Sequence, residues 1–418
     1  MKKFLLFAAF GCFSCTGPIQ EDESLVENLM KGEPQNFEMI LTRRELLEVQ
    51  IIYTQIDRGE NNLPSFKSFY YNVDTTRYFY PASTVKFPMC LLALDKINKL
   101  GIEGLEKYTP MFHDSVYGGQ LTVIRDTTSE SGVPSVAHYI KKILTVSDND
   151  AHNRLYEFMG QKASNDILHE KGYDVRFLHR LERALSPDQN RHTEAVRFIK
   201  DGKIIFEQPM LVNEDSIKPP AMVVKGKGYY KSDTILVQKP YDFTYKNFFS
   251  LKDQQDMLRA VLFPESVSST ARFNLSDEDY QFLYQYMSQL PTETLYPAYS
   301  KDSSYYDAYC KFFMYGAAKE ERIPGTIRIF NKVGNAYGYL IDNAYIVDFK
   351  SGVEFMISAV INVNTDEVYN DGKYEYETIG YPFFKDLGQL FYQYELKRPR
   401  KNKPDLSKFV INYDLERP

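Results

Sequence analysis

Strand-like segments lie near both ends of this chain, and helical patterns fill its middle. Residues 48–57 and 68–73 are rich in β-branched and aromatic side chains, as strands are, and a turn-rich stretch separates them. The same content returns late in the chain, at residues 325–333, 343–349 and 353–363. We therefore predict an α/β (α+β) fold of two lobes, in which one lobe is a mainly antiparallel sheet built from both chain ends and the other is helical.

The first helix of the middle region has the clearest boundaries. Apolar residues recur at helical spacing over residues 81–100, and Gly101 follows where such a helix would end. We expect the helical lobe to span residues 83–290. Short strand-like pieces around a turn rich in Gly, Lys and Tyr predict an inserted β element at residues 196–243. Further helices are expected at residues 136–145, 149–160, 162–172, 251–262, 277–290 and 381–396.

Ser83 and Lys86 lie three residues apart at the start of this first helix. Positions i and i+3 share a helix face, so the lysine amine can lie near the serine hydroxyl. A hydroxyl is a weak nucleophile until a base takes its proton, and a desolvated lysine with a lowered pKa can be that base. The free N–H groups of a helix start would also stabilise an oxyanion. Taken alone, the pair would more simply be a helix-start serine beside a solvated lysine.

Two further short patterns follow in the chain. Ser147-Asp148-Asn149 occurs once, and a predicted strand ends in Lys332-Val333-Gly334. The triplet could also act only as a helix cap, since Ser, Asp and Asn are favoured there. The 6 histidines are scattered, without a pair at zinc-binding spacing, and no Gly-x-Ser-x-Gly surrounds any serine. Neither a metal site nor an α/β-hydrolase triad is indicated, and we expect no cofactor.

The combination of these patterns resembles the class A β-lactamases and the penicillin-binding proteins. The resemblance covers most of residues 48–396 and includes Pro88 after the Ser-x-x-Lys motif. It implies that Ser83 attacks an amide carbonyl and becomes acylated, that Lys86 handles its proton, and that Ser147 relays a proton to the leaving nitrogen. The implied reaction is acyl transfer from a β-lactam or related amide to the serine and then to water.

The resemblance also assigns residues that bind the substrate. Asn149 would hydrogen-bond the amide side chain of the substrate, and Lys332 would place positive charge near the substrate carboxylate. Gly334 closes the Lys-x-Gly element. The backbone N–H of the next residue, Asn335, would form the oxyanion hole together with the N–H of the nucleophile.

The assignment of the deacylating base rests on one loop. Glu182 resembles the glutamate that activates the deacylating water in this family, although Glu194 could be the relevant acid instead. Four residues after Glu182, where the family usually offers an Asn that holds this water, the chain has Ser186. Val333 stands where the family has a hydroxyl residue that helps to hold the substrate carboxylate. A literal Lys350-Ser351-Gly352 lies between two apolar runs, where a hairpin turn is expected.

The first 15 residues are typical of a bacterial export signal. Met1-Lys2-Lys3 precede a short apolar run, and small residues precede both Cys12 and Cys15. This resembles a lipoprotein processing box with Cys15 as the lipidated residue; Cys12, or an ordinary cleaved signal, is the alternative. A lipid there would attach the exported protein to a membrane, in the periplasm or cell envelope. Residues 16–34 are polar and acidic enough to form a flexible tether.

The main domain is expected to span residues 35–396. Residues 397–418 are expected to form a C-terminal extension, in which the basic run 397–404 is a solvated continuation of the last helix. The domain contains two cysteines, Cys90 and Cys310, which are too few for a disulfide framework. Cys90 is expected to be a buried thiol, although an exported compartment would permit a bridge to Cys310.

The expected function is therefore that of an exported serine hydrolase acting on a β-lactam or a related cell-wall peptide. A peptidoglycan carboxypeptidase or transpeptidase is one alternative, and only the loop glutamate separates it from a β-lactamase. A lipoprotein that binds cell-wall fragments without turnover is another, which Val333 and the insertion favour and the intact serine and lysine motifs oppose. The formal charge of -6 is spread along the chain without a basic face, so nucleic acid is not an expected partner.

Overall fold

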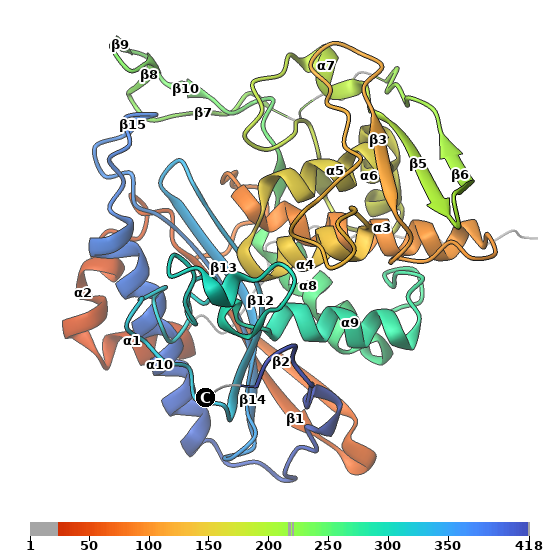
Figure 1. Ribbon diagram of the computed structural model, residues 1–418. Coiled ribbons are helices and arrows are strands. Elements are labelled where there is room, and N and C mark those ends of the chain that lie inside the picture. Colours follow the sequence, from red (N-terminus) through yellow and green to blue (C-terminus); the bar gives the residue numbers. More distant parts are fainter. Residues whose placement is uncertain (1–23, 216–218, 220, 417–418) are drawn as a thin grey trace, which may run out of the picture.

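A five-stranded antiparallel sheet forms the centre of the computed structural model, which describes residues 24–215, 219 and 221–416 (Figure 1). The strand order is β12-β13-β14-β1-β2. The strands are β1 (Gln50–Arg58), β2 (Pro64–Tyr71), β12 (Ile327–Ala336), β13 (Tyr339–Asp348) and β14 (Val353–Asn362). Because β1 pairs with β14, the two ends of the chain share one sheet, and the predicted two-lobe α/β fold is confirmed.

Three helices cover one face of this sheet: α1 (Ser24–Lys31), α2 (Pro34–Thr42) and α10 (Tyr381–Lys397). The prediction of a flexible tether over residues 16–34 is therefore wrong from residue 24 onward. Val26 and Met30 lie one turn apart on α1, are fully buried, and join the apolar cluster beneath the sheet. Such a short helix is stabilised by packing rather than by its own helix propensity. The polar residues around Val26 and Met30 hide this apolar pair in the sequence.

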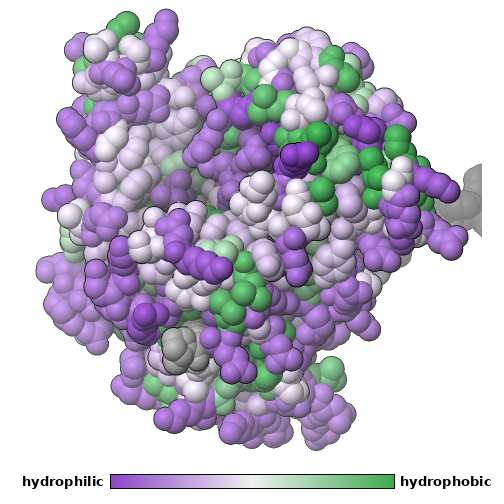
Figure 2. Space-filling view, viewed as in Figure 1, coloured by the Kyte–Doolittle hydropathy of each residue, from purple (hydrophilic) through white to green (hydrophobic). Residues whose placement is uncertain are grey.

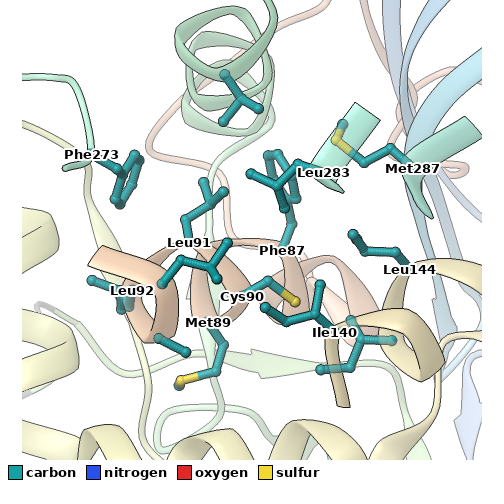
Figure 3. Close-up of a cluster of buried hydrophobic side chains, with 14 of the residues drawn as sticks. Phe87, Met89, Cys90, Leu91, Leu92, Ile140, Leu144, Phe273, Leu283 and Met287 are labelled. Carbon is teal, nitrogen blue, oxygen red and sulfur yellow. The ribbon is translucent and has the colours of Figure 1, made fainter. Parts of the chain in front are cut away.

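The helical lobe is built around α3 (Lys86–Leu100), whose side chains are apolar nearly all the way round. A helix of that kind belongs in a core. Figure 3 shows its side chains surrounded by those of neighbouring segments. The other helices of the lobe are α4 (Val136–Val146), α5 (Asn149–Met159), α6 (Gln161–Glu170), α8 (Leu251–Leu262) and α9 (Asp277–Ser288).

The stretch from residue 196 to 243 contributes to two separate β units. One is a three-stranded sheet beside the helical lobe, formed by β3 (Met111–Asp114), β5 (Ala195–Lys200) and β6 (Lys203–Gln208). The other is an arm that projects from the body in Figure 1, and Figure 2 shows that most of this face of the molecule is hydrophilic. The arm comprises β7 (Val224–Lys225), β8 (Gly228–Ser232), β9 (Ile235–Val237), β10 (Tyr241–Asp242) and β15 (Val368–Tyr369).

The C-terminal residues do not continue the last helix into solvent. After α10 ends at Lys397, Arg398 adopts an extended conformation and pairs with the buried carboxylate of Glu395 at 2.9 Å. The chain then folds back, and Leu406 and Phe409 are buried in the core of the helical lobe. Residues 397–404 do not continue the helix as expected, because α10 ends at Lys397, and the two apolar residues that follow this run cover the lobe.

Two smaller features agree with the sequence. Cys90 and Cys310 are buried free thiols. Residues 350–352 form the turn that joins β13 to β14, with Gly352 at a φ of 72°. Within the described ranges, no helix is both long and apolar enough to cross a membrane. Cys15 and the proposed signal lie outside the described residues.

Candidate active site

Ser83 lies in the 3₁₀ turn Ala82–Val85, which opens directly into α3. The turn packs against β12 so closely that Gly334 has no room for a side chain. A Cβ atom at Gly334 would lie 3.0 Å from the backbone N of Ser83 and 2.9 Å from the carbonyl oxygen of Pro81. Ala82 has a φ of 48°, in the left-handed region that residues with a side chain rarely adopt. The backbone around the serine is thus held in one tightly packed arrangement.

Replacing Gly334 with alanine should therefore destabilise the protein, by about 1–3 kcal/mol, because the new methyl group meets backbone atoms that cannot move aside easily. Gly325→Ala is the matched control, since a Cβ atom there meets nothing within 4 Å. Urea unfolding of the two variants measures the difference. Equal stabilities would show that the turn and the strand are not packed as described.

Two lysines converge on Ser147. Lys86 Nζ donates hydrogen bonds to the carbonyl oxygen of Ser147 and, at 3.3 Å, to its Oγ. Lys332 Nζ donates to the same Oγ at 2.8 Å and to the carbonyl oxygen of Val333 at 2.7 Å. The three groups come from α3, β12 and the residue that ends α4, so the fold itself assembles them.

Burial changes the protonation of both lysines. Lys86 is 0% exposed, and desolvation, followed by the nearby charge of Lys332, holds its pKa well below the usual value. Burial, partly offset by Cys310, Cys90 and Asp342, lowers the pKa of Lys332 to about 8. A neutral amine at Lys86 can accept a proton, and Lys332 carries its positive charge below a pH of about 8. The pair therefore offers a base and a cation side by side.

The Ser147-Asp148-Asn149 triplet serves both as a cap and as part of the site. The side chain of Asp148 accepts a hydrogen bond from the Ala151 N–H at 2.7 Å and so caps α5. Ser147 and Asn149, on either side of it, line the same cavity as Ser83. The helix cap and the catalytic interpretation are therefore compatible.

This cavity has a volume of about 990 Å³ and lies between the sheet and the helical lobe. The residues predicted for the site that line it are Ser83, Ser147, Asn149, Glu182 and Asn335, and Val333 lines it as well. Lys86 and Lys332 lie directly behind Ser147, and Gly334 lies against the serine turn. The structure thus brings together all the residues that the motifs nominate. Tyrosines form much of the remaining wall: Tyr80, Tyr306, Tyr309, Tyr337, Tyr374 and Tyr381.

The loop that carries Glu182 is anchored from beneath. Asn153, on α5, accepts a hydrogen bond from the Leu181 N–H and donates one to the Leu181 carbonyl oxygen, both at 2.9 Å. Arg180 forms a buried bidentate pair with Glu157, also on α5, at 2.5 and 2.7 Å. These contacts hold the backbone immediately before Glu182, whose exposed side chain faces the cavity and whose φ is 50°.

The alternative base, Glu194, and the residue at the position of the family Asn, Ser186, have other structural roles. Glu194 is buried in an ion pair with Arg154 at 2.8 Å and is not among the cavity residues. Glu182 is the one carboxylate among the described residues that line the cavity. Ser186 caps the short helix α7 (Pro187–Arg191) by accepting a hydrogen bond from the Gln189 N–H at 3.1 Å. Ser186 therefore does not take the place of the missing Asn at the cavity.

Sequence reasoning missed Asn153 and the tyrosine-rich wall. Asn153 follows Asn149 by four residues on a predicted helix, so the shared face was a usable signal. The wall residues Tyr306, Tyr309 and Phe312 belong to an irregular stretch between α9 and β12, where no pattern in the sequence marks a binding surface.

The chain was compared with known proteins. A profile described as the β-lactamase enzyme family matches residues 38–394. No curated protein matches the chain. A β-lactamase structure from Sphaerobacter thermophilus DSM 20745 is 13% identical, with a TM-score of 0.49 and coverage of 91% of this chain and 99% of that one.

Two further solved structures are similar at the same level. A β-lactamase from Chitinophaga pinensis DSM 2588 is 11% identical, covering 87% of this chain and 98% of its own, with a TM-score of 0.48. PBP-A is 15% identical, covering 88% and 95%, with a TM-score of 0.46. Since the family profile matches most of the length of the chain, this protein belongs to the β-lactamase enzyme family.

Proposed function

We propose that the protein transfers the acyl group of a β-lactam or related cell-wall amide to Ser83 and then to water. The observation that carries this proposal is the convergence of two buried lysines on Ser147 Oγ, in the cavity that Ser83 lines. If Ser147 had only a structural role, it would not need a neutral base and a cation placed side by side at its hydroxyl.

The acylation step follows from these positions. Lys86, as the neutral amine, takes the proton of Ser83, and the Oγ forms a bond to the amide carbonyl carbon. The oxyanion is stabilised by the backbone N–H groups of Ser83 and Asn335. When the C–N bond breaks, Ser147 gives its proton to the leaving nitrogen and regains one from the protonated Lys86. The products are an ester on Ser83 and a free amine, and the lysine is neutral again.

Deacylation would use the one carboxylate on the cavity wall. Glu182 would take a proton from water as the water oxygen attacks the ester carbonyl, and Ser83 would recover that proton when the C–O bond breaks. The sum of both steps is amide plus water giving acid plus amine.

Hydrolysis of a chromogenic cephalosporin by the purified protein tests the proposal. The wild type should turn the substrate over, and Ser83→Ala should not. Mass spectrometry of the protein after mixing separates the outcomes: an adduct that persists without turnover would favour a penicillin-binding peptidase. Absence of both adduct and turnover would contradict acyl transfer and favour a non-catalytic binding protein.

The penicillin-binding alternative has one specific observation in its favour. Ser186 caps α7, and the family Asn that would hold the deacylating water is absent at that position. Glu182 is exposed rather than enclosed, so water near it is less ordered by the protein. A long-lived acyl-enzyme would be the consequence, with a D-alanyl peptide as the substrate.

The pH dependence should show an alkaline limb near pH 8. Lys332 carries its charge below its pKa of about 8 and loses it as the pH rises through that value. The attraction for a substrate carboxylate is then lost, so kcat/KM should fall, mainly through KM. Lys332→Arg keeps its charge, so its limb should move upward; a wild-type profile that stays flat through pH 8 would contradict this role of Lys332.

We also propose that the chain is exported and attached to a membrane through a lipid on Cys15. The support for this is the sequence of the first residues alone.

A further inference from the structure

Lys246 lines the same cavity as Ser83 but belongs to neither lysine motif. It lies between β10 and β11 (Phe248–Phe249), where the chain returns from the projecting arm to the helical lobe. Its Nζ lies 5.7 Å from the centre of the Tyr337 ring. Burial and the charge of Lys246 together hold the pKa of the neighbouring His179 at about 4, so His179 stays neutral at physiological pH.

The next residue fixes the position of Lys246. Asn247 is fully buried, and its Oδ1 accepts hydrogen bonds from the backbone N–H groups of Leu178 and His179 at 2.8 and 3.1 Å. Its Nδ2 donates to the His179 carbonyl oxygen at 3.2 Å. The backbone that carries Lys246 is therefore tied to the loop that carries Glu182, so Lys246 extends from a fixed point on the cavity wall.

The other cations of the site are already used by the protein. Lys86 and Lys332 donate to Ser147, Arg180 is paired with Glu157, and Arg183 donates to the Gly119 carbonyl oxygen. Lys246, in contrast, takes part in no ion pair among the described residues. A half-buried ammonium group on a cavity wall without a protein carboxylate is available to an anionic ligand.

Aromatic rings surround the approach to this ammonium group. The rings of Tyr80 and His179 are parallel, with centroids 6.2 Å apart, and Tyr337 meets Tyr80 edge-on at 5.0 Å. Tyr80 is three residues from the nucleophile in sequence, and both tyrosines line the cavity. Such rings can cover the apolar part of a ligand whose charged end reaches Lys246.

We propose, on the basis of the proposed function, that Lys246 determines specificity by binding a carboxylate on the acyl part of the substrate. Lys332 and Ser147 serve the leaving nitrogen and the carboxylate beside it, so a second cation, placed with the Glu182 loop, matches a second carboxylate on the other side of the scissile bond. The preferred substrate class is then an amide with an anionic group on its acyl portion, whose apolar stem lies against Tyr80 and Tyr337.

Two penicillins that differ by one carboxylate test this proposal: benzylpenicillin and α-carboxybenzylpenicillin. The measured quantity is the ratio of their second-order rate constants for acylation of Ser83. The wild type should favour the carboxylated compound by about tenfold, the effect of one charged hydrogen bond. Lys246→Met should bring the ratio close to one, and Lys246→Arg should preserve the preference. Lys239→Met, an exposed lysine on the same arm, is the matched control and should leave the ratio unchanged.

The outcomes separate this inference from the proposed function. Acylation by both penicillins without a preference, or a preference that survives in Lys246→Met, would overturn the role of Lys246 and leave acyl transfer intact. No acylation of the wild type by either compound would overturn both. If Lys246→Met fails to fold, Lys246→Gln, which keeps a polar side chain of similar length, is read in its place with the same expected loss of preference.

Discussion

Lys86→Met should lower the rate of Ser83 acylation about a thousandfold, within the range that a positioned general base contributes. The methionine fills a similar buried space, but its thioether sulfur is far too weak a base to take the serine proton. It also removes the hydrogen bonds to Ser147, so the proton relay to the leaving nitrogen is interrupted. Stopped-flow measurement with a fluorescent penicillin gives the acylation rate constant directly.

Lys96→Met is the matched control for this change. Lys96 lies on the same helix and burial lowers its pKa to about 8, but its Nζ donates to the carbonyl oxygen of Phe158 and to Gln208 rather than to Ser147. If the rate fell only because a buried ammonium group was removed from α3, both variants would be slowed to a similar degree. An acylation rate for Lys86→Met within about threefold of that for Lys96→Met would contradict the assignment of Lys86 as the base.

Arg180→Met should destabilise the protein by about 3–5 kcal/mol, because it leaves the carboxylate of Glu157 buried and without its partner. Arg180 also donates to the carbonyl oxygens of Gln189 at 3.1 Å and His192 at 2.7 Å, so it ties both ends of the Glu182 loop together. Chemical denaturation measures the loss of stability.

The control is an arginine pair nearer the surface. Arg197 pairs with Asp114 at 2.8 Å, and both side chains are partly exposed. Arg197→Met should therefore cost less than about 1 kcal/mol. Equal losses for Arg180→Met and Arg197→Met would mean that the buried pair does not anchor the loop. If the anchor is as described, Arg180→Met should also slow deacylation more than acylation.

Local patterns in the sequence were enough to predict the sheet and the central helix. The strands carry β-branched and aromatic residues, and residues 86–100 have apolar side chains at helical spacing with a glycine after them, so each element can be recognised within its own segment. The same is true of Ser83 and Lys86, whose proximity follows from helix geometry alone. Elements of this kind can be recognised without knowing what lies across from them.

Features that depend on distant partners were not predicted. The helix α1 is eight residues long and forms because Val26 and Met30 find an apolar surface provided by other parts of the chain. Leu406 and Phe409 are isolated apolar residues in a basic tail, and they are buried only because the folded helical lobe offers an apolar surface against which they pack. The sequence therefore predicts solvated segments where the structure has packed ones.

The candidate site divides in the same way. Its motif residues were named from the sequence, but the geometry that makes them a site lies in long-range contacts. Lys332 reaches Ser147 across 185 positions of the chain. The Glu157 to Arg180 pair and Lys246 depend on residues of other elements, so no spacing within their own segments points to them.

The most direct test of the central claim is to locate the acyl group. The protein is mixed with benzylpenicillin, quenched and digested, and the peptides are identified by mass spectrometry. The account predicts that the mass of the intact penicillin is added to the peptide that contains Ser83 and to no other. An adduct on a different residue, or unmodified Ser83 peptide from a folded protein that also fails to hydrolyse the penicillin, would contradict it.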